Sequence, residues 1–206
     1  MSRQRERMPD PAVMIFAERS AQDRLRIAQV AARYIAEHGI ADWGLAKRKA
    51  VRQLGLPDRE ALPGDHEIEV ALVEYHTLYG GAAHAARLRE QRVEALRWMR
   101  NLGPFAPQLV GGVAAGWATA HSDIRLDLVA ADAKEVEMAL LNAGVAYRTM
   151  HGDRDGAAEL YIDTPVAGVR LSVRSAAVAR QRQQRDRSGQ APPRLDTTVL
   201  AALLAD

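Results

Sequence analysis

The amino-acid sequence predicts an α+β protein, in which an N-terminal helical unit precedes a small mixed β-sheet. Two observations predict this class. Residues 20–102 carry apolar residues at spacings of three and four, the period of an amphipathic helix. Residues 124–173 include stretches in which apolar and polar residues alternate, as in half-buried strands. The period changes at Gly103-Pro104, and we place the boundary between the two halves there.

The first half is expected to form about four helices, as in a bundle. Residues 1–19 form a polar arm with two prolines. Glycine and proline separate the apolar stripes that follow, which span about 20–38, 42–54, 65–79 and 82–102. Asp42 is the expected N-cap of the second helix, and Gly80-Gly81 breaks the third from the fourth. Residues 20–103 are therefore interpreted as a helical domain.

The second half has the expected order β-α-β-α-β-β-β. A short strand at 109–110 leads into Gly111-Gly112 and a run of small apolar residues. Asp132 starts a helix that ends at Gly144. The other expected strands cover 124–129, 145–150, 159–163 and 169–173. We interpret 104–174 as an α/β domain and 175–206 as an arginine-rich tail that closes with a short helix.

Composition excludes several classes of protein. The 206 residues are 48% hydrophobic and 26% charged, as in an ordinary globular chain. The sequence contains no cysteine, which excludes disulfide scaffolds, thiolate metal sites, iron–sulfur clusters and a cysteine nucleophile. It has no phosphate-binding Gly-Lys-Ser/Thr loop, no signal-peptide core and no apolar stretch long enough for a bilayer. We expect a cytoplasmic protein with no membrane partner.

The charges are balanced overall but unevenly distributed. The net charge is +2, from 28 basic and 26 acidic residues. The stretch from Arg174 to Arg194 holds six arginines and one acid, and residues 46–52 form a basic turn of the second helix. Such segments are typical of solvated surfaces, and they are also typical of contacts with RNA, DNA or an acidic protein. A non-catalytic interaction module is therefore one functional hypothesis.

The most informative stretch runs from Leu109 to Leu128. It contains a strand, the pair Gly111-Gly112, a short helix, and a strand that opens with Ser122-Asp123. This pattern resembles the polymerase-β-like nucleotidyltransferase superfamily. There, a glycine pair approaches a triphosphate, and an Asp-x-Asp pair on the next strand holds divalent ions with a third carboxylate from a later strand. The resemblance covers about 104–173 and implies that fold, nucleotide binding and Mg²⁺ as a cofactor.

A looser resemblance extends over the whole chain. Residues 24–40, 46–56 and 67–69 look like a family of small bacterial nucleotidyltransferase-like proteins. That resemblance implies a fold and no particular activity. It leaves the substrate, the pathway and the oligomeric state open.

The sequence departs from the superfamily pattern at the metal site. Arg125 stands where the second carboxylate is expected, and Asp127 lies about 13 Å along the strand from Asp123, too far to share an ion. The third carboxylate would have to come from Glu159 or Asp163. A guanidinium can pair with a phosphate, but it cannot activate a hydroxyl as a metal does.

Three interpretations of this strand stay open: an ordinary charged face, a site that binds a nucleotide or phosphorylated ligand without transfer, and an active enzyme with a rearranged site. For the last, Asp123 is the catalytic candidate, and Asp123 and Asp163 are the candidate metal ligands. Phosphate binding is assigned to residues that supply backbone amides, a hydroxyl or a positive charge: Gly111, Gly112, Ser122, Arg125 and Arg170.

Overall fold

The protein is an α+β chain with a five-stranded mixed sheet, which confirms the predicted fold class. The computed structural model describes residues 11–57, 62–150, 158–181 and 193–205. The contacts divide the chain into two compact units, Met1–Tyr75 and His76–Asp206. Within the described part of the chain, no helix is both long enough and apolar enough to span a bilayer.

The first unit is a packed set of three helices: α1 (Pro11–His38), α2 (Trp43–Gln53) and α3 (Asp65–Tyr75). The Asp42 carboxylate accepts a hydrogen bond from the Leu45 amide at 3.0 Å, so this residue is the N-cap expected from the sequence. Helix α1 begins at Pro11, not at residue 20, and residues 11–19 are therefore helical instead of an irregular arm. Proline is compatible with a first helical turn, because that turn needs no amide donor.

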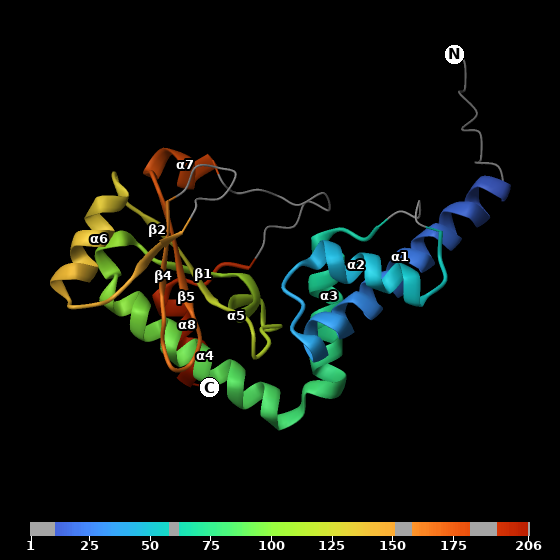
Figure 1. Cartoon of the computed structure of the whole chain (residues 1–206), viewed down its shortest axis with the longest axis horizontal. Helices are drawn as coiled ribbons and strands as arrows, with labels where there is room; N and C mark the ends of the chain where they lie inside the picture. Colours follow the sequence, from blue (N-terminus) through green and yellow to red (C-terminus); the bar gives the residue numbers. More distant parts are fainter. Residues whose placement is uncertain (1–10, 58–61, 151–157, 182–192, 206) are drawn as a thin grey trace, which may run out of the picture. The chain divides into compact units, whose positions relative to one another are not determined.

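The second unit combines a sheet with helices. Its strands are β1 (Gln108–Val110), β2 (Ile124–Val129), β3 (Arg148–Met150), β4 (Ala158–Ile162) and β5 (Val169–Arg174). Its helices are α4 (Gly81–Asn101), α5 (Gly111–Ala115), α6 (Ala133–Asn142), α7 (Ala176–Gln181) and α8 (Thr197–Ala205), with a π-helix at His76–Gly80 and a 3-10 turn at Gly103–Phe105. Figure 1 shows α4 and α8 running together beside the sheet.

The unit boundary lies between Tyr75 and His76, whereas the sequence analysis placed it at 103–104. The difference comes from α4, which the periodicity grouped with the helices before it. Ala95 and Met99 of α4 are fully buried in the cluster that also contains Leu126 of β2. A helix stripe indicates that one face is buried, but it does not indicate which element covers that face.

The strands lie in the order β1-β2-β5-β4-β3, in which β2 and β5 are parallel and the other neighbours are antiparallel. Every second residue of β2 and β5 faces the core. These core residues are large and apolar, and all are at most 5% exposed: Ile124, Leu126, Leu128, Val169, Leu171 and Val173. The alternating residues face the other way and carry the charges. We call this second surface the polar face.

Candidate functional site

The polar face brings together side chains from three adjacent strands. In the ladder Arg125 of β2 is the register partner of Arg170 of β5, and Arg170 is the partner of Tyr161 of β4. Because residues in register on neighbouring strands lie about 5 Å apart, these three side chains start from adjacent positions. Asp123 lies just before β2 and Glu159 lies on β4, so carboxylates flank the same row.

Arg170 is held by two carboxylates at once. Its Nη2 donates to Asp123 at 3.1 Å and its Nη1 lies 3.4 Å from Glu159. The three side chains are 31%, 29% and 8% exposed, so this group is partly shielded from water. The guanidinium occupies the space between the two carboxylates. We call this group the Arg170 clamp.

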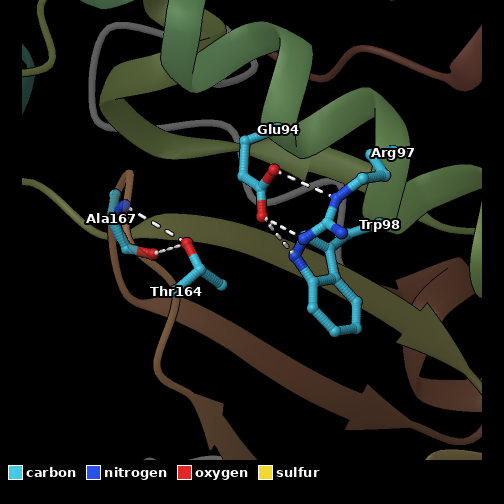
Figure 2. Close-up of polar contacts among 5 residues, drawn as sticks. All are labelled: Glu94, Arg97, Trp98, Thr164 and Ala167. Carbon is cyan, nitrogen blue, oxygen red and sulfur yellow. Dashed lines mark hydrogen bonds and ion pairs between the residues drawn. The ribbon is translucent and has the colours of Figure 1, made fainter. Parts of the chain in front are cut away.

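The loop between β4 and β5 closes tightly over the clamp. Thr164 Oγ1 donates to the Ala167 carbonyl at 2.7 Å and accepts from the Ala167 amide at 3.3 Å, as Figure 2 shows. The next residue, Gly168, lies so close that a Cβ there would collide with the Tyr161 hydroxyl and come within 2.7 Å of an Asp123 oxygen. Burial and the negative charges of Asp123 and Asp163 raise the pKa of the Tyr161 phenol.

Arg125 differs from Arg170, because it is exposed and its guanidinium makes no ion pair or hydrogen bond with the described residues. Its stem covers Gly111, where a Cβ would lie 3.2 Å from the arginine Cδ. Gly111 also has φ of +71°, a left-handed conformation that favours glycine. The structure therefore brings Gly111 and Arg125 together, and Arg125 keeps a positive charge available for an anion.

Gly112 has a structural explanation of its own. A Cβ at this position would lie 2.7 Å from carbon atoms of the Trp117 ring. Its carbonyl also accepts hydrogen bonds from the amides of Gly116, Trp117 and Ala118 at 2.8–3.1 Å. The close approach that requires glycine here is therefore an approach of Trp117. Binding of phosphate by Gly112 stays a prediction without a contact of this kind to support it.

Ser122 belongs to a closed turn before β2. Its hydroxyl accepts from the Thr119 amide at 2.9 Å, and its carbonyl accepts from the buried Gln91 side chain at 3.3 Å. The hydroxyl is also 3.2 Å from Thr119 Oγ1. These bonds tie the start of β2 to α4 and orient Asp123, which follows directly. They give Ser122 a positioning role that the sequence pattern did not indicate.

The candidate carboxylates do not gather into a metal site. Asp163 is paired with Arg148 at 2.8 Å and its side chain is 74% exposed, while Asp123 is engaged by Arg170. In residues 11–57, 62–150, 158–181 and 193–205, no three histidine, aspartate or glutamate side chains are grouped so as to hold a metal ion. Of the two candidates for a third carboxylate, Glu159 is the one that shares a cation with Asp123.

A further buried acid, Glu94 of α4, is also fully engaged. It accepts hydrogen bonds from Arg97 at 2.6 Å and from the Trp98 indole at 2.9 Å (Figure 2). Both partners come from the same helix, one turn away. Glu94 therefore stabilises α4 and is not a free catalytic carboxylate.

Two of the four cations in the basic turn of α2 are paired with carboxylates. Lys47 is buried and its amino group lies 2.7 Å from the Asp65 carboxylate. Arg48 pairs with Asp42 at 3.8 Å, and Lys49 lies over the Tyr34 ring at 5.7 Å. Most of the arginine-rich stretch, residues 182–192, lies outside the described residues.

Two features of the charged residues near this surface were missed at the level of sequence. Arg174 is only 7% exposed although it ends β5, and Arg194 pairs with Asp127 at 3.0 Å across 67 positions. The alternation over 169–173 indicated the orientation of β5, and extending it by one residue places Arg174 on the polar face. Its burial depends on tertiary packing, for which no sequence signal exists.

Comparison of the chain with models of protein families, with curated proteins and with solved structures found no match in any of the three.

Proposed function

We propose that this protein is a nucleotidyltransferase-like protein that binds a nucleotide or another phosphorylated ligand on the polar face, without metal-dependent transfer. One observation carries the proposal. Arg125 is an exposed cation without a partner among the described residues, and it lies over Gly111 next to the Arg170 clamp.

Arg125 has the chemistry that such binding needs. A planar guanidinium donates two parallel hydrogen bonds to phosphate oxygens and keeps its charge in proteins. Exposure lets a ligand reach it without rearrangement of the sheet. The fixed strand β2 limits the movement of its stem, so less conformational entropy is lost when a phosphate binds.

The Arg170 clamp argues against two-metal transfer. A guanidinium has no open coordination position and cannot lower the pKa of a hydroxyl as a bound metal does. The carboxylates of Asp123 and Glu159 are already used for Arg170, and Arg125 stands at the position of the second metal ligand. These residues do not fit a pair of Mg²⁺ ions, and no step through Mg²⁺ is derived.

The interaction module remains the alternative. The pairing of Lys47 with Asp65 and of Arg48 with Asp42 lowers the charge that α2 can offer to a polyanion. For that reason we favour the small phosphorylated ligand. Salt-sensitive, saturable RNA binding with no response to any nucleotide would favour the module.

Thermal unfolding with a panel of nucleoside triphosphates, and with the matching nucleosides, tests the proposal. A ligand at 100 times its Kd stabilises the protein by about 2.7 kcal/mol. We expect a triphosphate to stabilise the protein, the nucleoside to do so less, and Arg125→Ala to remove the difference. Arg87→Ala is the matched control, because Arg87 is an exposed arginine of α4. A response that survives Arg125→Ala would overturn the assignment.

A further inference from the structure

A cavity of about 350 Å³ lies at the other end of the polar face, where the parallel strands β2 and β5 end. It is lined by Asp127 and Val129 of β2, Arg174 of β5, Ala176 and Ala179 of α7, and residues of the neighbouring strand β1 and its partner segment. Its size is that of a small-molecule site. Neither Arg125 nor Gly111 is among the described residues that line this cavity, so it is distinct from the proposed phosphate site.

Arg174 is the unusual group in this cavity. It is 7% exposed, and its Nε and Nη1 atoms are buried without a hydrogen-bond partner among the described residues. A buried guanidinium stays charged, so leaving its donors unpaired is costly. Each such group in a folded protein needs an explanation, and a bound ion that supplies the missing acceptors is one of them.

The other charges in the cavity do not compensate for Arg174. Asp127 accepts from Arg194 at 3.0 Å, and Arg194 also donates to Gln108 at 3.2 Å. The negative charge of Asp127 is therefore already matched. The described residues that line the cavity therefore carry one unmatched positive charge, that of Arg174.

We propose that this cavity binds the carboxylate of a small, partly apolar ligand, with Arg174 as the residue that pairs with it. A carboxylate supplies two acceptor oxygens that match Nε and Nη1 of one guanidinium. A singly charged anion also balances the one unmatched cation. The alanines of α7 and Val129 offer an apolar wall to the rest of the ligand. A phosphate dianion would bring a second, uncompensated charge into this cavity.

Titration of the full chain with butyrate tests the proposal, followed by the arginine Nε–H signals in NMR spectra and by thermal unfolding. We expect butyrate to shift the Arg174 Nε–H signal and to raise Tm saturably. Butyramide, which has the same shape without the charge, should do neither. Inorganic phosphate is the comparison anion, and it should bind more weakly than butyrate.

Arg174→Gln should lower butyrate affinity by at least about tenfold, because a hydrogen-bonded charge is lost. Arg100→Gln changes an exposed residue of α4 and is the matched control. It should leave the affinity for butyrate unchanged. Arg125→Ala should also leave it unchanged, which separates this site from the proposed function. Arg174→Lys keeps a charge without the planar fork, and it should bind butyrate more weakly than the wild type.

The proposal is overturned if butyrate neither shifts the Arg174 signal nor stabilises the wild type. It is also overturned if Arg174→Gln binds butyrate as well as the wild type does. Phosphate binding that depends on Arg174, without butyrate binding, would overturn the assignment of a carboxylate ligand. The NMR readout on the wild type decides the question even if a variant fails to fold.

Discussion

Arg170 and Arg174 lie four residues apart on the same strand and point to the same face of the sheet, yet their surroundings are opposite. Arg170 is held by Asp123 and Glu159, whereas Arg174 is more deeply buried and has two donor atoms without an acceptor among the described residues. The same residue type on one strand is thus a structural cross-link at one position and an unsatisfied cation at the other.

The register alone does not explain the difference, because Glu159 of β4 is the partner of Ser172 and lies two positions from both arginines. The Glu159 carboxylate pairs with Arg170, at 3.4 Å from Nη1, and Asp123 supplies a second acceptor to the same guanidinium. Both carboxylates therefore serve Arg170, and Arg174 keeps two donor atoms without an acceptor among the described residues.

The largest expected effect comes from removing the clamped arginine. Arg170→Gln leaves the carboxylates of Asp123 and Glu159 close together without a cation, and it should lower the free energy of unfolding by about 2–4 kcal/mol. Urea unfolding measures this value. Arg87→Gln, at an exposed position, should change it by less than about 0.5 kcal/mol. Equal stabilities of the two variants would show that the clamp contributes nothing.

A second change disturbs the clamp from the backbone side. Gly168→Ala puts a methyl group where the Tyr161 hydroxyl and an Asp123 oxygen lie, and it should cost about 1–3 kcal/mol in unfolding free energy. Gly103→Ala is the matched control, because no atom lies within 4 Å of a Cβ at Gly103. If chemical denaturation finds both variants equally stable, the close approach at Gly168 is not a constraint.

The unsatisfied arginine should respond in the opposite direction. Arg174→Gln removes a buried charge that has no described partner, and it should leave stability unchanged or raise it by up to about 1 kcal/mol. Denaturant unfolding in a buffer without carboxylate or phosphate ions is the measurement. A loss comparable to that of Arg170→Gln would mean that Arg174 is also a structural residue, and the contrast between the two would disappear.

His76 extends the comparison of Arg170 and Arg174 to a group that can lose its charge. A partly buried histidine can release its proton, whereas an arginine cannot. Burial and the charge of His84, whose ring stacks on it at 3.8 Å, lower the pKa of His76 from 6.5 to about 4. Between these pH values the unfolded chain binds more protons than the folded chain. Stability should therefore fall as the pH is lowered from about 6.5 to about 4.

His76→Gln should reduce this pH dependence, and Tm measured at pH 7 and at pH 4.5 checks it. His121→Gln, at an exposed position, is the control and should keep the wild-type dependence. A His76→Gln variant with an unchanged pH profile would contradict the assignment of this effect to His76.

The sequence predicted the fold class, because fold class depends on local patterns. Alternation over 124–129 indicated which side chains of β2 leave the core. The resemblance implied that the glycine pair shares a site with Asp123, and the contact that the structure shows is between Gly111 and Arg125.

The partners of the charges could not be predicted in this way. The bonds from Arg170 to Asp123 and Glu159 span 47 and 11 positions and depend on the register of β2, β5 and β4. The pairing of Lys47 with Asp65 likewise depends on how α2 packs within its unit. A sequence shows which residues are charged, but the packed structure decides which of them are neutralised.

The central claim is that the Arg125 guanidinium, and not a metal ion, binds the phosphorylated ligand. Its most direct test is calorimetric titration of the protein with ATP, once with excess EDTA and once with Mg²⁺. The account predicts binding in EDTA that is at least as tight as binding in Mg²⁺, and that Arg125→Ala weakens it by at least about tenfold. Binding that requires Mg²⁺ and survives Arg125→Ala would contradict it.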